Sequence, residues 1–413
     1  MRILLINQAF HPDVVSSGQH LTDLALALAQ EHRVSVVTSA TGYDDPTARY
    51  PRSEVWRGIR IQRIWFPRWS KRFKITRALD FLGFLLAAAM KLAVTPRADA
   101  VVAMTSPPLF SVLAALFVRL RGGRLTLWVM DLNPDESVAA GWLSEDAWVT
   151  RALQRLLRFS LKTAATVVTL DRFMAARIAE KGVATSAIRV VPPWSHADVT
   201  FDAEGRERFR ADHGLGPEFV VMYAGNHSPC HPLTTLMHAA LELRSERSIV
   251  FCFIGGGSVA SDVRAFAQHH NLENILQLPY QPREQLSAAI SAGDLHVVAL
   301  GDPFVGTVHP CKVYNLLRIG ARVLYIGPPQ SHISDIARSA PSGHIVSVRH
   351  GDVPAAIDAI RAAHCGGFTP GAPLDAPYEA SVHIPVLVSL IVSTQHGAIT
   401  ATEMPCAGKG VSQ

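Results

Sequence analysis

Residues 219–243 read FVVMYAGNHSPCHPLTTLMHAALEL, and this stretch contains the pattern that decides the fold. An apolar run at 219–223 leads into a loop with glycine, histidine and proline, and a helical pattern follows at 233–243. A short apolar run that ends in such a loop predicts a buried strand. A second apolar run, at 249–254, comes directly after the helix. The segment therefore predicts a strand–helix–strand unit with parallel strands.

The beginning of the chain repeats this layout. A strand is expected at 2–6, a loop at 7–18, a helix at 19–30 and a second strand at 34–38. Further strands are expected at 100–104, 125–130, 166–170, 275–278, 295–300 and 321–326, and further helices at 109–120, 149–161, 283–292 and 312–319. Two such starts in one chain predict an α/β protein with two doubly wound, Rossmann-like domains that face a central cleft.

The size of the chain agrees with two domains. Its 413 residues exceed what one hydrophobic core usually holds, and 48% of them are hydrophobic while 18% are charged. The segment 191–204 contains Pro192, Pro193 and Trp194 and is expected to link the domains. We therefore expect domains at 1–195 and 196–365 and a poorly defined tail at 366–413.

Several protein classes are disfavoured by composition. The five cysteines are scattered without a C-x-x-C pair, and no H-E-x-x-H occurs, so we expect a reducing compartment and no metal site. The first residues, MRILLINQAF, read as a buried strand and not as a signal peptide. No run reaches the roughly 20 apolar residues of a spanning helix. These features predict a cytoplasmic protein.

A basic and aromatic segment at 55–79 has eight cations and no carboxylate, and the apolar run FLGFLLAAAM follows it. This combination fits an anionic membrane surface. A solvated surface beside a core helix is the plain alternative, and nucleic acid is disfavoured although the same side chains could bind phosphates and bases. The expected membrane-contact residues are Arg68, Trp69, Lys71, Arg72, Phe73 and Lys74.

Loops that follow the predicted strands carry candidate ligand-binding residues. In the first domain, 16–20 read SSGQH, where Gly18 would let the backbone approach a ligand at a helix start. In the second, 225–232 read GNHSPCHP, and His231 could donate to a phosphate. A plain turn and structural histidines are the alternatives. The dinucleotide fingerprint G-x-G-x-x-G follows neither first strand.

Two further loops hold the candidate reactive groups. Residues 301–320 read GDPFVGTVHPCKVYNLLRIG, in which the lone cation Lys312 opens a helix, so we expect an anion there, most plausibly a phosphate. An ordinary strand-to-helix connection is the alternative. In 131–136, DLNPDE, Asp131 follows a strand and could act as a base, while Asp135 and Glu136 suit the first turn of a helix.

Together these motifs resemble glycosyltransferases of the GT-B fold, and in particular the family-4 retaining enzymes that build bacterial surface polysaccharides. The resemblance covers 1–346. It is carried by the segments 1–20, 131–134, 190–194, 222–233, 253–258, 278–286, 290–298 and 308–328. It implies that a nucleotide-sugar donor binds mainly the second domain and an acceptor the first.

The resemblance also implies roles for single residues. Asn226 and His231 occupy positions where the family has an arginine and a lysine on the donor diphosphate, and Asp131 lies near a common acceptor-site histidine. The expected donor-binding residues are Gly18, Asn226, His227, His231, Gly256, Tyr280, Gly306, Lys312 and Asn315. Two family glutamates fall at Thr307 and Asn315, so Asn315 would have to hold the donor ribose through its amide.

The expected activity is metal-independent sugar transfer, without a cofactor, from a nucleotide-diphosphate sugar to a lipid-linked saccharide acceptor at the inner face of the plasma membrane. Asp131 and Lys312 are the expected catalytic residues. A nucleotide-sugar epimerase on the same fold is one alternative, disfavoured by the basic and aromatic segment. A non-catalytic sugar-nucleotide-binding partner in polysaccharide assembly is the other. The missing glutamates are the best argument for it, whereas Gly18, Asp131 and Lys312 argue against it.

Overall fold

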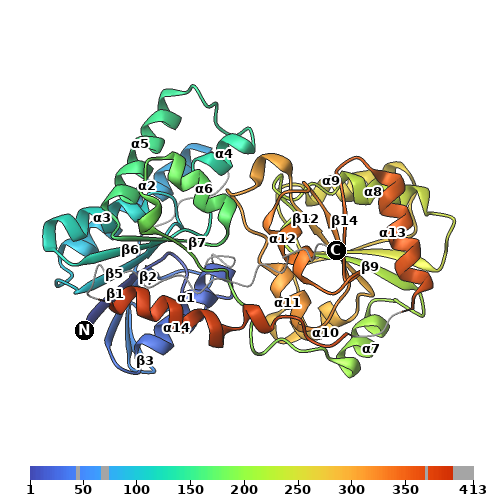
Figure 1. Cartoon of the computed structure of the whole chain (residues 1–413), viewed down its shortest axis with the longest axis horizontal. Coiled ribbons are helices and arrows are strands. Elements are labelled where there is room, and N and C mark those ends of the chain that lie inside the picture. The colour runs from blue at the N-terminus through green and yellow to red at the C-terminus, as the bar shows by residue number, and fades with distance from the viewer. Residues whose placement is uncertain (43–46, 67–73, 368–370, 394–413) are drawn as a thin grey trace, which may run out of the picture.

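The structure is a computed structural model that describes residues 1–42, 47–66, 74–367 and 371–393, with the side chains of 74–78 left out. Two α/β domains lie side by side, the first coloured blue to green and the second yellow to orange in Figure 1. Each contains a mainly parallel sheet with helices on its faces. This confirms the fold class expected from the sequence.

The first domain is built on a sheet of eight strands among the described residues. Their order is β3 (Ser53–Trp56), β4 (Ile59–Ile64), β2 (Arg33–Ser39), β1 (Arg2–Ile6), β5 (Ala100–Met104), β6 (Arg124–Trp128), β7 (Thr166–Thr169) and β8 (Ile188–Val190). Only β3 among these pairs antiparallel. The central strands are apolar runs because helices cover both of their faces.

The helices of the first domain follow its strands in the order expected of a doubly wound sheet. They are α1 (Ser16–Leu28), α2 (Lys74–Ala93), α3 (Phe110–Arg121), α4 (Asp135–Ala139), α5 (Trp148–Thr163) and α6 (Arg172–Glu180), with a 3-10 turn at Thr185–Ala187. The helix predicted at 19–30 thus begins three residues earlier.

The second domain contains a fully parallel sheet. Its described strands are ordered β11 (Ile275–Leu278), β10 (Ile249–Ile254), β9 (Phe219–Ala224), β12 (Leu295–Ala299), β13 (Val323–Ile326) and β14 (Ile345–Val348). Its helices are α7 (Ala203–Asp212), α8 (Thr234–Glu242), α9 (Ala260–His269), α10 (Leu286–Ser291), α11 (Lys312–Arg318), α12 (His332–Ser339) and α13 (Val353–Cys365). Three 3-10 turns lie at Arg283–Gln285, Asp302–Phe304 and Ala376–Tyr378.

The connection between the domains is anchored to the first domain. Trp194 is almost fully buried, packs near Trp128, and donates from Nε1 to Asp23 Oδ2 at 2.9 Å. The proline pair that precedes it ends strand pairing, as the sequence indicates.

The end of the described chain returns to the first domain. Helix α14 (Ala380–Val392) lies along α1 and reaches β5, and Leu387 and Ile391 enter the core of that domain. Part of the segment expected to be a poorly defined tail therefore closes the first domain.

Candidate functional site

The loop after β12 and the turn after β6 meet between the two domains. The backbone N–H of Leu132 donates to the carbonyl of Thr307 at 2.9 Å, and Cys230 Sγ lies 3.7 Å from Glu136 Oε1. The segment that carries Asp131 and the loop that leads to Lys312 are thus brought together from opposite domains.

The ammonium of Lys312 is buried, and it has no anionic partner among the described residues. Its Nζ has no hydrogen-bond partner within the described part of the chain and lies 3.7 Å from the centre of the Tyr223 ring. A Cβ added to Gly225, whose φ is +137°, would come within 3.0 Å of this Nζ. Burial lowers the pKa of Lys312 to about 7. The ring face stabilises the ammonium only in part, so the arrangement favours a negatively charged ligand.

The helix that begins at Lys312 contributes less to the binding of an anion than the sequence suggests. Helix α11 has seven residues, Lys312–Arg318, and none of them is acidic in its first turn. A helix this short has a weak dipole. The positive charge at this point therefore comes from the Lys312 side chain.

His231 is held in place by a hydrogen bond to the backbone of β12. Its Nδ1 lies 2.8 Å from the carbonyl oxygen of Ala299, which can only accept, so Nδ1 carries the proton. Burial, followed by the neighbouring Lys312, lowers the pKa of His231 to about 3. In the free protein the neutral ring has no second proton to offer, and donation from His231 to a bound phosphate stays a prediction.

His227 lies in the same loop as His231, four residues earlier in the chain. Its Nδ1 is 3.1 Å from the carbonyl of Gly225, and its backbone N–H donates to Gly256 at 2.8 Å. Burial is the main cause of its lowered pKa. His227 thus joins the loop after β9 to the loop after β10, while the side chain of Asn226 is exposed beside them.

The glycines after β10 allow these two loops to pack closely. A Cβ on Gly257, at φ +138°, would overlap the carbonyl of His227. Gly256 lies under the ring of Tyr280, whose hydroxyl donates to the Gly256 carbonyl at 3.1 Å. Direct contacts of Asn226, Gly256 or Tyr280 with a donor stay predictions.

Gly306 and Gly18 lie in tight backbone contacts. Gly306 has a φ of +73°, and a Cβ there would come within 2.8 Å of the Phe173 backbone in α6. It therefore packs across the domain boundary, and a contact of its backbone with the donor stays a prediction. A Cβ on Gly18 would lie 3.2 Å from that of Ala9, so this glycine lets the loop after β1 pack on α1.

Asp131 is placed as a candidate base. Its backbone N–H donates to Thr105 Oγ1 at 3.3 Å. Burial, followed by the charge of Glu136, raises the pKa of its carboxyl to about 7. A carboxyl with a pKa near neutrality can accept a proton at physiological pH.

The two positions that replace the family glutamates have local partners. The Thr307 hydroxyl is buried and donates to the carbonyl of Phe304 at 3.0 Å. Asn315 Oδ1 accepts from the backbone N–H of His196 at 3.1 Å, which leaves its amide NH₂ for a ligand. The Thr307 hydroxyl carries no negative charge and cannot act as a carboxylate, whereas the amide NH₂ of Asn315 can still donate a hydrogen bond.

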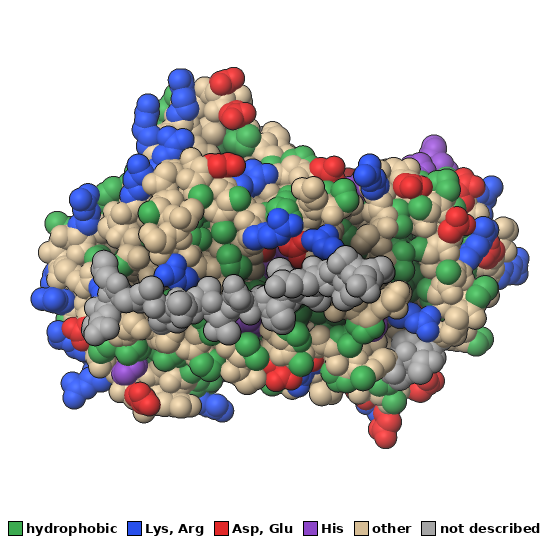
Figure 2. Space-filling model, viewed as in Figure 1, with side chains coloured by type: hydrophobic (Ala, Val, Ile, Leu, Met, Phe, Trp, Pro, Cys, Tyr) green, Lys and Arg blue, Asp and Glu red, His purple; other side chains and the backbone are tan. Residues whose placement is uncertain are grey.

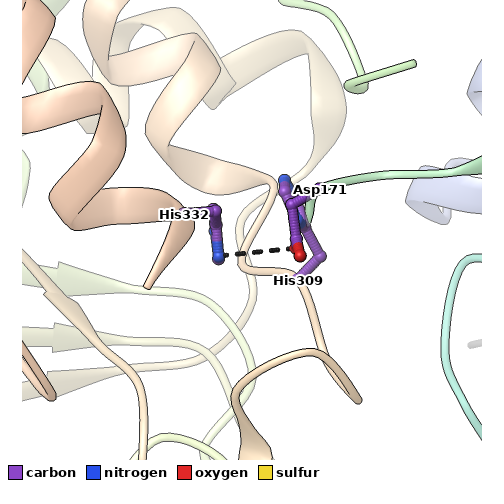
Figure 3. A group of neighbouring side chains, drawn as sticks. All are labelled: Asp171, His309 and His332. Atoms are coloured by element: carbon purple, nitrogen blue, oxygen red, sulfur yellow. Dashed lines mark hydrogen bonds and ion pairs between the residues drawn. The ribbon is translucent and has the colours of Figure 1, made fainter. Parts of the chain in front are cut away.

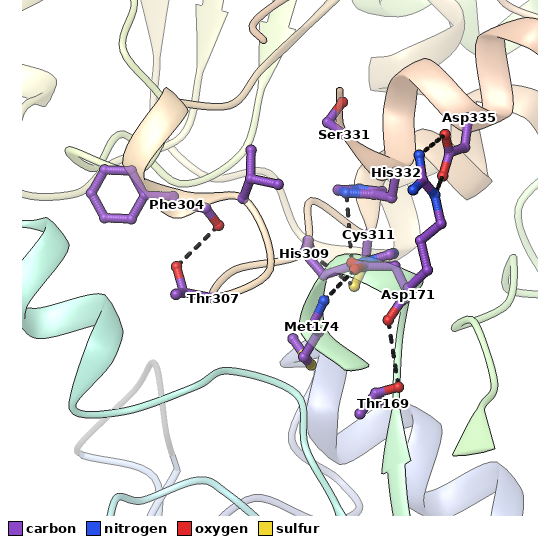
Figure 4. A network of polar contacts seen from close by, with 12 residues as sticks. Thr169, Asp171, Met174, Phe304, Thr307, His309, Cys311, Ser331, His332 and Asp335 are labelled. Atoms are coloured by element: carbon purple, nitrogen blue, oxygen red, sulfur yellow. Dashed lines mark hydrogen bonds and ion pairs between the residues drawn. The ribbon is translucent and has the colours of Figure 1, made fainter. Parts of the chain in front are cut away.

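A buried polar network next to these residues was not anticipated from the sequence. His309 Nδ1 and Asp171 Oδ2 lie 2.7 Å apart, and His309 Nε2 lies 2.7 Å from the Tyr314 hydroxyl. Asp171 Oδ1 also accepts from Met174 N at 2.8 Å and caps α6. Figures 3 and 4 show how Asp171 of the first domain meets His309 and His332 of the second.

The three residues could be taken for a metal site, because their ligand atoms lie within 4.8 Å of one another. The rings of His309 and His332, however, stack with centroids 3.7 Å apart at 20°. Their lone pairs therefore run side by side and do not converge on one point, and both His309 nitrogens already have partners. The geometry is that of a hydrogen-bond network.

A signal for Asp171 was present in the sequence. It directly follows the strand predicted at 166–170, in the same way that Asp131 follows 125–130. His309 lies three residues before Lys312. The pairing of Asp171 with His309 could not be predicted from the sequence, because 138 residues separate the two partners.

The expected membrane-contact residues 68–73 lie outside the described residues, and of Lys74 only the backbone is described, at the start of α2. Among the helices of the described chain, none combines the length and the apolar character that crossing a bilayer requires.

Comparisons with known proteins agree with this architecture. Residues 17–194 match a family model described as a glycosyl transferase 4-like domain. The putative colanic acid biosynthesis glycosyl transferase WcaI of Escherichia coli is 25% identical over 387 residues, which are 88% of this chain and 92% of WcaI.

Two solved structures share the fold. Sucrose-phosphate synthase from Thermosynechococcus elongatus aligns with a TM-score of 0.72 at 14% identity, over 94% of this chain and 98% of that one. Anabaena HepE in complex with UDP aligns with a TM-score of 0.62 at 13% identity, over 95% of each chain.

Proposed function

Since this chain is a glycosyltransferase of the GT-B fold that resembles the family-4 enzymes, we propose its donor, acceptor and mechanism. The donor is a nucleotide-diphosphate sugar, and the acceptor is a lipid-linked saccharide of a surface polysaccharide. Transfer retains the configuration of the sugar and needs no metal. The names of WcaI, with its colanic acid pathway, and of the HepE complex with UDP support this choice of pathway and donor.

The observation that carries the proposal is the buried ammonium of Lys312, which has no hydrogen-bond partner in the part of the chain that the structure describes. A donor diphosphate beside Nζ would supply the missing anion and would raise the lowered pKa of the amine, so that the amine is charged when donor is bound. The charge would then offset the negative charge that builds up on the departing diphosphate, which is the largest contribution in many transfer reactions.

Asp131 would act on the acceptor side. Its carboxyl would accept the proton of the attacking hydroxyl, or orient that hydroxyl, and its raised pKa matches this task at neutral pH. The hydrogen bond from Leu132 to Thr307 couples the Asp131 turn to the loop that leads to Lys312. The two groups would thus act on the two ends of the same reaction.

Association with the cytosolic face of a membrane would bring the protein to such an acceptor. Helix α2 follows the basic and aromatic segment and exposes Leu82, Leu86 and Met90 at helical spacing. Exposed apolar residues next to cations are typical of a helix that rests on a bilayer surface.

The test is to incubate the full chain with labelled nucleotide sugars and a bacterial lipid extract. Label that moves into lipid supports transfer, whereas a changed free sugar nucleotide would indicate an epimerase, and binding of the sugar nucleotide without turnover would indicate a non-catalytic partner. We expect Lys312→Met to lower kcat/KM by about 10²-fold to 10³-fold, as loss of one preorganised charge-stabilising group does. Lys162→Met, which changes an exposed lysine on α5, is the matched control and should transfer normally.

A further inference from the structure

The first domain contains an apolar pocket that the proposed chemistry does not use. It has a volume of about 190 Å³ and lies among helices α2, α3, α4 and α5. Its apolar wall is formed by Phe81, Leu109, Val112, Pro134, Leu153 and Leu157. A cavity of about 150 Å³ with such a lining holds benzene in another protein, so this one can hold a short part of an apolar chain.

The polar side chains at the pocket rim already have partners. Asn133 donates to Glu136 at 2.8 Å and accepts from Ser137 at 2.9 Å, and Ser111 donates toward Ser160 at 3.4 Å. A ligand would therefore find few free hydrogen-bonding groups there. The lining selects for hydrocarbon.

The pocket lies next to the turn that carries Asp131, the candidate residue on the acceptor side. Asn133 and Pro134 belong to the same turn as Asp131, and Thr105, which also lines the pocket, accepts from the backbone N–H of Asp131. A molecule with its reacting hydroxyl at Asp131 could extend past this turn into the apolar space.

Leu109 shows that the pocket wall is held under constraint. Its φ of +69° lies in the left-handed region, which a leucine rarely adopts. Such conformations persist where the surrounding structure fixes them, and they gather at ligand-binding sites.

The surface outside the pocket suits an anionic bilayer. Helix α3 packs against both α2 and α5, so the three helices form one face. Leu86, Met90 and Leu120 are exposed on α2 and α3, and α5 exposes Arg151, Arg155 and Arg158. Figure 2 shows Lys and Arg side chains gathered over the α5 side of this domain. Apolar and basic side chains on one face match acyl chains and anionic headgroups.

We propose that this pocket binds part of the hydrocarbon chain of a lipid-linked acceptor, which enters from the bilayer under the α2–α3–α5 face while its saccharide lies at Asp131. The inference rests on the proposed function for the identity of the acceptor. It adds a subsite for the lipid, formed by Phe81, Leu109, Val112, Leu153 and Leu157.

The test uses the full chain with a photoactivatable farnesyl phosphate, a prenyl phosphate with a diazirine on its chain, in vesicles of phosphatidylcholine and phosphatidylglycerol. We expect label in peptides that contain residues 105–112 and 153–157. Leu153→Trp and Val112→Phe, which fill the pocket, should each lower this labelling about tenfold, the scale of losing a few methylene contacts. Leu156→Trp adds the same bulk on the exposed side of α5 and should not.

Competition distinguishes the ligand classes. Unlabelled farnesyl phosphate should compete, whereas inorganic phosphate should not. If inorganic phosphate competed as well as farnesyl phosphate, the label would report a phosphate site and the hydrocarbon subsite would be overturned. Label elsewhere, or label that both pocket-filling variants leave unchanged while they melt like the parent, would overturn the site itself.

The outcome is independent of sugar transfer, because photolabelling needs no donor. Label at the pocket in a protein that transfers no sugar would refute the proposed function and leave the hydrocarbon subsite standing. With an active enzyme, Leu153→Trp should raise the KM for a prenyl-linked acceptor about tenfold and leave the KM for the same saccharide without lipid unchanged. An equal rise for both would contradict the subsite.

Discussion

Lys312 shows at the scale of one residue how a binding site can lower the stability of the free protein. Its pKa is about 7 in the folded chain against 10.5 for a free lysine, because burial opposes the charge. Between these values the unfolded chain binds more protons, so stability rises with pH. The destabilisation is fully present below pH 7 and disappears above about pH 10.5.

We therefore expect Lys312→Met to be more stable than the parent by up to a few kcal/mol at pH 6, with a gain that shrinks toward pH 10. Thermal unfolding across this range measures it. UDP should raise the melting temperature of the parent and not of Lys312→Met. A variant that melts at the same temperature as the parent at pH 6 would show that the ammonium has an anion in the free protein.

Asp131 should appear in the pH dependence of the reaction. Its pKa is raised to about 7, so the carboxylate that accepts a proton forms only as the pH rises through neutrality. We expect kcat/KM for transfer to rise with pH up to about 7, and Asp131→Asn to lower it by about 10²-fold to 10⁴-fold, the usual contribution of a general base.

The contribution of the Asp131 carboxyl to folding stability falls as the pH rises, whereas its expected contribution to activity increases. The protonated carboxyl stabilises the folded state fully below its unfolded pKa of 3.8, and this contribution is lost as pH rises through 7. Asp131→Asn should thus gain stability over the parent at pH 8. An inactive variant without this gain would argue that the carboxyl is not buried as described.

Single residues at strand ends could be predicted from sequence, whereas their partners could not. Asp131 and Lys312 stand out because each follows a predicted strand, where ligands meet an α/β sheet. The tautomer of His231 depends on the Ala299 carbonyl, and the packing of Gly306 depends on the backbone of α6. Such contacts join distant segments, so no local pattern predicts them.

At the scale of elements, apolar runs predicted the buried strands well and the last helix poorly. Helix α14 contains Pro385, which lacks an N–H and breaks the helical pattern in the sequence. The surface that stabilises α14 is α1, more than 350 positions earlier in the chain, and this partner is not visible locally.

Helix α14 should contribute to the stability of the first domain. Leu387 is about 1% exposed in that core, so Leu387→Ala should lower the free energy of unfolding by about 2–5 kcal/mol. Val386→Ala removes a smaller side chain from the exposed face of the same helix and should change it by less than about 0.5 kcal/mol. Urea denaturation compares them, and equal effects would mean that α14 is not docked.

At the scale of the whole molecule, the relation between the two domains depends on a few polar contacts that differ in burial. Asp171 and His309 form a buried pair, and Arg172 and Asp335 form an exposed one at 2.7 Å. Arg177 adds a hydrogen bond from Nε to the Val305 carbonyl at 2.6 Å. These contacts hold the loop that leads to Lys312 against α6, so they set the distance between donor and acceptor groups.

We expect the buried pair of Asp171 and His309 to contribute more to stability than the exposed pair between Arg172 and Asp335. Burial alone would raise the pKa of Asp171, but the hydrogen bond from His309 and the neighbouring charges hold it well below 3.8. Its stabilisation is therefore present above pH 3.8 and is lost only as pH falls through the lowered pKa. Asp171→Asn keeps an oxygen to cap α6 and removes the charge, and it should cost about 1.5–3 kcal/mol at pH 7.

Asp335→Asn is the matched control, because it removes a carboxylate from an exposed pair between the same domains and should cost at most about 1 kcal/mol. We also expect Asp171→Asn, and not Asp335→Asn, to enlarge the radius of gyration in X-ray scattering, since the loop before α11 loses its hold on the first domain. The KM for the donor should rise with it, because Lys312 is positioned by that loop. If both variants unfolded and scattered alike, the two domains would be held together by their apolar contacts, and the network would serve only to cap α6.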